Sequence, residues 1–298
     1  MGEESINRSK KTLTMRLTMQ YVLKPRDRVF DTELQFPDIG EDEVVGVSFS
    51  GGMESTLIAK LAIDFYGVDR VKLLVFDNIF SRDVPVQIET VVANCERSAI
   101  AIGYDPTKLH RMTFDSELHQ TDRIASLTNV KDYILEQYPN LAHLYFGFTN
   151  VFFDVEPLNS SMYTIEDMRA IIESDREKFE RVIDEFHTDY SDFYMSLLQG
   201  MNIKSETYEF LSTTEKVMTP FDNLDKGEIV DLYYQLGLED LLEQTWSCTT
   251  YAVLGHEKHC GDCFNCQQRY DGYRHAGKED PTDYLRDVVK KYWDLRST

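Results

Sequence analysis

A short run of small and hydroxylated residues, Ser50-Gly51-Gly52-Met53-Glu54-Ser55-Thr56, has the composition of a phosphate-binding loop. Its glycines let the backbone approach an anion closely, and the helix expected after them would direct unpaired N–H groups and a positive dipole end at it. Ser50 and Ser55 add hydroxyl donors. The loop lacks the lysine of the Gly-x-x-x-x-Gly-Lys-Ser/Thr motif, so a Walker-type NTPase is excluded. The alternative, a simple tight turn, is disfavoured by its position between a strand and a helix.

A second chemical cluster lies near the C-terminus, where Cys248, Cys260, Cys263 and Cys266 fall within one short span. Four thiolates at such spacing suit tetrahedral zinc, and four protein ligands leave no position for water, so the metal would be structural. Two alternatives stay open: an iron–sulfur cluster in the same cysteines, or His256 or His259 in place of one of them. The short runs between these cysteines, 261–262 and 264–265, are expected to be turns.

The remaining cysteine, Cys95, stands alone within a segment of helical character. It could be a nucleophile, but a single cysteine in a helix is more often a small core residue, and we favour that interpretation.

The elements that must position these groups follow an α/β order. Apolar runs predict strands at 44–49 and 71–76, with a helix from 55 to 63 between them. Two parallel strands joined by a helix form a right-handed crossover whose ligand groups lie at the carboxyl ends of the strands. The same reasoning predicts a helix at 85–102, strands at 108–114 and 142–146, amphipathic helices within 164–200, and a helix at 226–236. The alternating segment 13–23 could extend the sheet.

Composition narrows the class of protein. The chain has 298 residues, 42% of them hydrophobic, which suits a folded α/β protein, and its net charge of −21 opposes tracking along nucleic acid. Residues 1–11 lack the apolar core of a signal peptide, and no stretch approaches the ~18 apolar residues of a membrane helix. We therefore expect a soluble, cytoplasmic protein with a small-molecule substrate, no direct nucleic-acid partner and no membrane partner. The odd cysteine count, with no export signal, disfavours a disulfide framework.

The loop at 50–55 resembles that of the N-type ATP pyrophosphatases, the PP-loop superfamily, which reads Ser-Gly-Gly-x-Asp-Ser. Those enzymes cleave ATP to AMP and pyrophosphate while adenylating an oxygen. Glu54 stands where the family has aspartate, and its longer carboxylate could contact magnesium or position water.

A closer resemblance, to 7-cyano-7-deazaguanine synthases of the QueC family, begins at Thr219-Pro220-Phe221-Asp222-Asn223-Leu224-Asp225-Lys226-Gly227-Glu228-Ile229. It continues through Glu243-Gln244-Thr245-Trp246-Ser247-Cys248, Cys260-Gly261-Asp262-Cys263-Phe264-Asn265-Cys266 and the 276–284 segment. The resemblance implies a parallel Rossmann-like sheet of the HUP (adenine nucleotide alpha hydrolase-like) type, with helices on both faces and a zinc-binding helical region after it. It also implies a homodimer that uses ATP, Mg²⁺ and one Zn²⁺ per subunit.

The activity that this resemblance implies is that of a carbon–nitrogen ligase in queuosine-type deazapurine biosynthesis. ATP activates 7-carboxy-7-deazaguanine, ammonia displaces AMP to give an amide, and a second ATP-driven dehydration gives the nitrile. Glu54, Ser55 and Lys226 would be catalytic, although Lys226 could equally be a solvated lysine at a helix start. The cysteines at 248, 260, 263 and 266 would bind zinc. The nucleotide would contact Ser48, Ser50, Gly51, Gly52, Met53, Glu54, Ser55, Thr56, Phe76, Asp77, Gly147 and Asn150.

The domain boundaries predicted on this basis are a strand-like extension at 1–40, a PP-loop domain at 41–217 and a cysteine-containing helical region at 218–298 packed on the same domain. The PP-loop domain would carry a helical insert at about 160–200. The chain departs from the family after Asp77 and after Asn150, where the segments expected to recognise the base are replaced.

Those departures leave two further hypotheses for the function. The first is a QueC-like enzyme that joins an activated deazapurine or another carboxylate to a different amine, such as a protein N-terminus in bacterial defence. The second is a nucleotide-binding protein in which Glu54 has weakened turnover.

Overall fold

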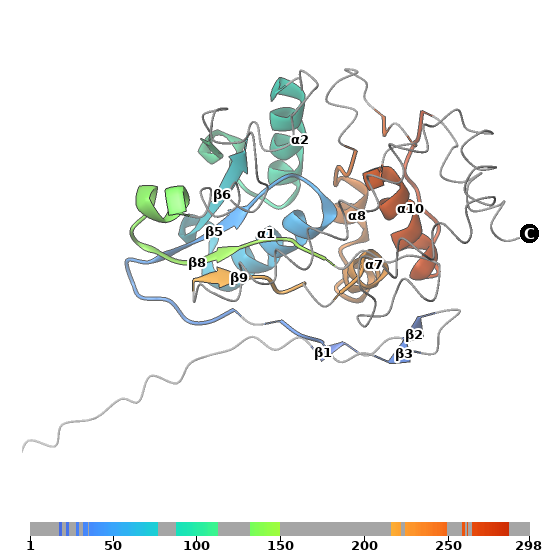
Figure 1. The fold of residues 1–298 in the computed structure, drawn as a ribbon, viewed down its shortest axis with the longest axis horizontal. Helices are drawn as coiled ribbons and strands as arrows, with labels where there is room; N and C mark the ends of the chain where they lie inside the picture. Colours follow the sequence, from blue (N-terminus) through green and yellow to red (C-terminus); the bar gives the residue numbers. More distant parts are fainter. Residues whose placement is uncertain are drawn as a thin grey trace, which may run out of the picture.

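The computed structural model describes residues 18–19, 22–23, 28–29, 32–34, 36–76, 88–112, 132–149, 216–221, 224–248, 258–259, 261 and 264–285. Its centre is a parallel five-stranded sheet in the order β7-β6-β5-β8-β9 (Figure 1). The strands are β5 (Val44–Ser48), β6 (Val71–Phe76), β7 (His110–Met112), β8 (Leu141–Tyr145) and β9 (Val217–Met218). The parallel α/β architecture expected from the sequence is confirmed.

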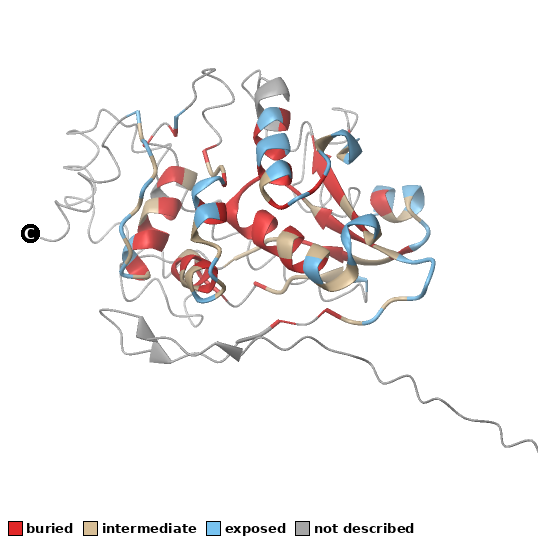
Figure 2. Cartoon of the chain, turned by 180° about the vertical axis from the view of Figure 1, so that it is seen from behind, coloured by how far each residue is buried: buried red, intermediate tan, exposed pale blue. Residues whose placement is uncertain are grey.

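Both faces of this sheet are buried, because side chains alternate along each strand. On β6, Leu73 and Val75 point into the main core, whereas Leu74 and Phe76 belong to a second apolar cluster on the opposite face. This second face is covered by a short helix at 132–137, whose Ile134 is fully buried. Helices therefore pack against both faces of the sheet, as predicted, and the strands and the first half of α1 are largely buried (Figure 2).

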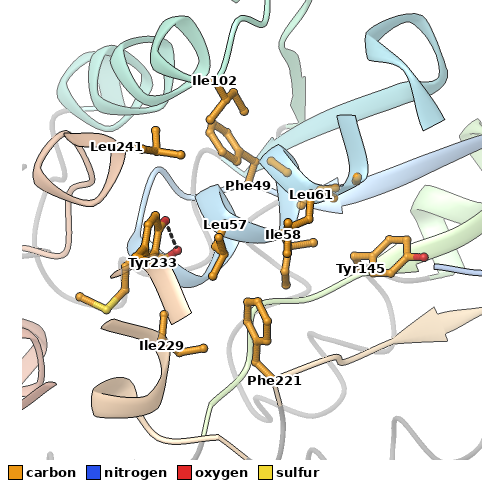
Figure 3. Packing of buried hydrophobic residues seen from close by; sticks show 14 of the residues in the cluster. Phe49, Leu57, Ile58, Leu61, Ile102, Tyr145, Phe221, Ile229, Tyr233 and Leu241 are labelled. Carbon is orange, nitrogen blue, oxygen red and sulfur yellow. Dashed lines mark hydrogen bonds between the residues drawn. The ribbon is translucent and has the colours of Figure 1, made fainter. Parts of the chain in front are cut away.

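The main core joins the sheet to α1 (Met53–Tyr66) and α2 (Ile88–Ala101) on its other face. The same core continues from α1 to α7 (Lys226–Gln235), α8 (Glu239–Glu243) and α10 (Phe264–His275), which lie beside the sheet (Figure 1). Leu57 and Ile58 of α1 pack with Phe221 and with Ile229 of α7, all of them fully buried (Figure 3). Burial of each such side chain contributes roughly 1.5–3 kcal/mol, so this cluster fixes α7 against α1.

A buried polar contact also joins these two helices. The Tyr233 hydroxyl on α7 donates to the carbonyl of Met53, in the first turn of α1, over 2.7 Å (Figure 3). Burial, with the Glu54 carboxylate nearby, raises the pKa of Tyr233 well above its usual value, so the hydroxyl keeps its proton and donates. The start of α1 is thereby fixed in register with α7.

Some expected elements differ from those observed. The strand β9 and the helix at 132–137 were not predicted, because a two-residue strand and a six-residue helix are too short for a periodic pattern. Phe264 and Asn265 were expected to form a turn, but they begin α10.

The N-terminal strands form two separate ladders. Thr18–Met19 (β1) pairs with Thr32–Glu33 (β4), and Val22–Leu23 (β2) pairs with Arg28–Val29 (β3), both antiparallel. In the part of the chain that the structure describes, these strands do not extend the five-stranded sheet, so that expectation was wrong. The predicted helical insert at 160–200 lies outside the described residues. None of the described helices is both long enough and apolar enough to span a membrane.

Candidate functional site

The glycine loop lies between β5 and α1, at the carboxyl end of the sheet. Gly51 adopts a left-handed backbone conformation (φ 73°), and a Cβ on it would lie 3.1 Å from the carbonyl oxygen of Asn94 on α2. Gly52 is the residue before α1 and gives the helix no side-chain cap. A helix start without such a cap presents backbone N–H groups to an incoming anion.

Two hydroxyl groups converge on this loop. The Oγ atoms of Ser50 and Ser55 are 3.1 Å apart, and the Ser50 N–H donates to Ser55 Oγ over 3.2 Å. The Gly52 N–H donates to Ser50 Oγ over 3.3 Å, and Ser55 Oγ also reaches the Gly52 carbonyl. Because hydroxyl groups rotate, the same two groups can donate to phosphate oxygens when an anion is bound.

Lys226 meets Glu54 at the edge of the loop. Their Nζ and Oε1 atoms are 2.9 Å apart, and the two side chains are only 14% and 12% exposed, respectively. Lys226 is the first residue of α7, directly after a capping box in which Asp225 and Glu228 each accept the other's backbone N–H. The capping box fixes the start of α7, and with it the position from which Lys226 reaches the loop.

Close helix packing also holds Lys226 in place. A Cβ on Gly272 of α10 would lie 2.9 Å from the Lys226 carbonyl oxygen, and one on Gly227 would lie 2.7 Å from His275 Cβ. Only glycine fits at these two positions without a shift of the backbone. The α7–α10 contact therefore determines where Lys226 begins its helix.

The segment that follows β8 passes directly over the start of α1. A Cβ on Gly147 would lie 2.9 Å from both Glu54 Cβ and the Ser55 nitrogen. Gly147 is therefore a neighbour of the loop, and its predicted contact with a nucleotide stays a prediction. Asn150 and Asp77, also predicted to contact the nucleotide, lie outside the described residues.

Three other residues that were predicted to contact the nucleotide have buried side chains. Met53, Thr56 and Phe76 are buried, and Met53 and Phe76 belong to the two apolar clusters. Ser48 is half-buried, at the last position of β5. If Met53, Thr56 and Phe76 contact a nucleotide, their backbone atoms must do so.

Two of the four predicted zinc ligands, Cys248 and Cys266, lie in one buried cluster with Trp246, Tyr270 and Tyr284 packed against it. Cys260 and Cys263 lie outside the described residues. Cys248 and Cys266 are thus brought together although they are 18 positions apart in the sequence, and their binding of a metal stays a prediction. Cys95, by contrast, is fully buried in the main core, which supports its interpretation as a core residue.

His259, one of the two histidines considered as alternative ligands, has a structural contact of its own. Its Nε2 accepts the Ser247 N–H over 3.1 Å, and its ring stacks on Trp246 with centroids 4.2 Å apart. His259 Nε2 is therefore engaged with the backbone of the segment that leads to Cys248.

Residues that the sequence did not single out also contact the loop. The Gly51 carbonyl accepts the Trp246 N–H over 2.8 Å and the Ser98 hydroxyl over 3.2 Å. The Arg97 guanidinium lies over the Trp246 ring, 5.5 Å from its centroid. The signal for Trp246 was its position two residues before Cys248, whereas no pattern indicated Ser98 or Arg97.

Comparison with known proteins agrees with the C-terminal motifs. The model of the family "Queuosine biosynthesis protein QueC" matches residues 177–277. A 7-cyano-7-deazaguanine synthase 1 from Sulfurisphaera tokodaii is 40% identical over 70 residues, which are 24% of this chain and 32% of that protein. A 7-cyano-7-deazaguanine synthase from Marinomonas sp. (strain MWYL1) is 32% identical over 98 residues, which are 33% of this chain and 41% of that protein. The match thus spans well under half the length of these relatives.

Among solved structures, the U34-tRNA thiolase NcsA from Methanococcus maripaludis, with its 4Fe-4S cluster, aligns with a TM-score of 0.35 and 13% identity. The alignment covers 87% of this chain and 74% of that one, and so low a score supports no argument about fold or cofactor. The sequence matches and the motifs described above show that the C-terminal part of the chain, over residues 177–277, is similar to the QueC family.

Proposed function

We propose that this protein is an ATP-dependent ligase that adenylates 7-carboxy-7-deazaguanine and converts it with ammonia to the amide and then the nitrile, 7-cyano-7-deazaguanine. The observation that carries the proposal is the contact between Lys226 and Glu54, 2.9 Å apart. Lys226 lies within the range of the QueC family match, whereas the glycine loop lies outside it, and this contact brings the two together. A phosphate-binding loop and a cation beside it are what ATP activation needs.

The residues divide the task of binding ATP. Backbone N–H groups at the start of α1, with the Ser50 and Ser55 hydroxyls, would bind the pyrophosphate portion. Lys226 would leave Glu54 and neutralise charge that develops on the phosphates. The substrate carboxylate would attack the α-phosphorus, forming the acyl adenylate and releasing pyrophosphate. Ammonia would then attack the acyl carbon, and AMP would leave with the bonding electrons.

Glu54 is the residue that would hold magnesium. Its Oε2 lies 3.6 Å from the position of a Cβ on Gly52, so the carboxylate lies beside this glycine, and carboxylate oxygens are ligands that Mg²⁺ prefers. Magnesium would supply charge neutralisation at the phosphates. Glu54 thus has two uses, as partner of Lys226 before nucleotide binds and as a metal ligand afterwards.

Zinc would have a structural role, held by Cys248, Cys260, Cys263 and Cys266. The buried pair Cys248 and Cys266 supports this assignment, as does the absence of an open position in a four-thiolate site. The ion would join the segment after α8 to the start of α10.

The direct test incubates purified, zinc-replete protein with ATP, magnesium, 7-carboxy-7-deazaguanine and ammonium. Pyrophosphate release and product mass are followed together. Amide or nitrile with AMP supports the proposal. ATP binding without product under these conditions argues against this acceptor.

A second function is favoured by the same ion pair, because a lysine held by Glu54 is less available to phosphate. In that case the protein binds ATP with little turnover, and Glu54→Asp, which withdraws the carboxylate by one methylene, should raise pyrophosphate release. If Glu54→Asp lowers pyrophosphate release instead, the longer carboxylate is suited to catalysis in this chain.

A further inference from the structure

The segment 245–248 joins the glycine loop to the cysteine cluster. It follows α8 and ends at Cys248. Its Trp246 N–H donates to the Gly51 carbonyl over 2.8 Å, and its Trp246 carbonyl oxygen lies 3.6 Å from the position of a Cβ on Gly52. The backbone of Trp246 therefore lies along both glycines of the loop.

His259 holds this segment from the side of the cysteine cluster. It is 5% exposed and stacks on the Trp246 ring, with an angle of 26° between the ring planes. Its Nε2 accepts the Ser247 N–H over 3.1 Å. One buried imidazole thus fixes both the ring of Trp246 and the peptide that follows it.

Arg269 holds the other end of the segment. Its side chain is fully buried, and its Nη1 donates to Thr245 Oγ1 over 2.8 Å while its Nη2 donates to the Leu242 carbonyl over 3.0 Å. Its Nε donates to Thr282 Oγ1 over 2.7 Å. Within the described ranges no carboxylate lies within ion-pair distance of this guanidinium, so its buried charge is held by neutral acceptors. Such donors hold their acceptors in a fixed geometry.

We infer that Trp246 is a positioning residue for the glycine loop, and that His259 and Arg269, acting through it, set the affinity of the loop for ATP. The Gly51 carbonyl has two donors, the Ser98 hydroxyl and the Trp246 N–H, and they orient the peptide that leads into α1. A loop held in its binding conformation does not have to be ordered when the ligand binds, and this raises affinity. The inference rests on the proposed function, because it assumes that the loop binds ATP.

The test compares ATP dissociation constants, measured by calorimetry on the full chain, for wild type, His259→Ala and Thr245→Val. Thr245→Val removes one of the acceptors of Arg269 but leaves His259 and all four cysteines in place. We expect each variant to bind ATP about tenfold more weakly, which corresponds to the loss of one ordered hydrogen bond. His259→Gln, which keeps an acceptor near the Nε2 position, should recover part of the affinity.

The matched control is His110→Ala. His110 on β7 also combines a ring contact and a hydrogen bond, since its Nδ1 is 2.8 Å from the Tyr138 hydroxyl and the two rings meet edge to face. It lies on the edge strand β7, two strands away from β5, the strand that leads into the glycine loop. This variant should lose thermal stability and keep the ATP affinity of wild type.

A spectroscopic readout supports the binding data. The chain has two tryptophans, so Trp293→Phe leaves Trp246 as the only one. In that background ATP should change the Trp246 fluorescence, and Thr245→Val should shift the midpoint of this titration by the same factor as in calorimetry.

The outcomes separate the inference from the function on which it rests. If wild type binds ATP and both Thr245→Val and His259→Ala bind it equally well, the positioning role is wrong and the proposed function stands. If His110→Ala weakens binding as much as they do, the effect is general destabilisation and the positioning role is again wrong. If wild type does not bind ATP, the proposed function itself fails.

Discussion

The ammonium of Lys226 lies 2.9 Å from Oε1 of Glu54, although 171 residues separate the two in the chain. Both side chains are largely buried, so each charge depends on the other while no ligand is bound. When ATP enters, the phosphates compete with Glu54 for Lys226. The pair therefore connects the stability of the ligand-free protein to its affinity for nucleotide.

Removal of the lysine charge should affect both properties. Lys226→Met leaves the Glu54 carboxylate without this partner and removes a cation from the phosphates. We expect pyrophosphate release, measured as kcat/KM, to fall by about 10²–10³-fold, with a lower melting temperature. Lys60→Met is the matched control, since it breaks an ion pair with Asp64 on the more exposed surface of α1. It should change activity by less than about twofold. Full activity in Lys226→Met would remove Lys226 from the mechanism.

Gly147 should tolerate no side chain. In Gly147→Ala the new Cβ would lie 2.9 Å from Glu54 Cβ and the Ser55 nitrogen, so the start of α1 must move. We expect the free energy of unfolding to fall by about 1–3 kcal/mol and ATP affinity to fall as well.

Gly46→Ala provides the comparison for Gly147. The three atoms nearest to its new Cβ would be leucine methyl groups, at 3.2 Å, in the apolar cluster on the other face of the sheet. Chemical denaturation and calorimetry should show a loss of stability in both variants, and a loss of ATP affinity in Gly147→Ala alone. Equal ATP affinities would contradict the contact between Gly147 and the binding loop.

Glu228 should make stability depend on pH. Burial raises the pKa of this carboxyl to about 7, against an ordinary value of 4.5, and its Oε1 has no hydrogen-bond partner among the described residues. Between pH 4.5 and 7 the folded protein therefore holds a proton that the unfolded chain has lost. The contribution of Glu228 to stability is present at low pH and is lost as pH rises through this window.

Glu228→Gln removes this titration and keeps an acceptor for the Asp225 N–H. The two proteins should be similarly stable near pH 4.5, and the variant should be more stable above pH 7, by up to about 3 kcal/mol. Denaturant unfolding across the pH range measures the difference, with the exposed Glu243→Gln as a control that should follow wild type. Parallel profiles for wild type and Glu228→Gln would show that the buried carboxyl does not titrate in this window.

Zinc content should depend on the clustered cysteines and not on Cys95. Cys248→Ser or Cys266→Ser should reduce zinc from one ion per chain, measured by elemental analysis, because a hydroxyl is a poor substitute for a thiolate at this ion. Cys95→Ser changes a cysteine that is equally buried but belongs to the main core, and it should retain the metal. Iron instead of zinc in protein purified without oxygen would favour the iron–sulfur alternative.

Much of the fold could be predicted from local sequence. The apolar runs at 44–48 and 71–76, the glycines at 51 and 52, and the amphipathic pattern of α7 each specify their own conformation over a few residues. The short β9 carries no such pattern. The N-terminal strands pair with one another, and the sequence could not show this, because backbone hydrogen bonds alone do not specify a partner.

For the site, the residue types of the phosphate loop and the cysteine cluster were evident in the sequence, because their chemistry depends on short spacings. The sequence alone could not show that Lys226 reaches Glu54, that Trp246 donates to Gly51, or that Gly147 lies on the start of α1. These pairs lie far apart in the chain. Only the packing of α7 against α1 and the parallel order of the strands bring them together, and no local pattern encodes that packing.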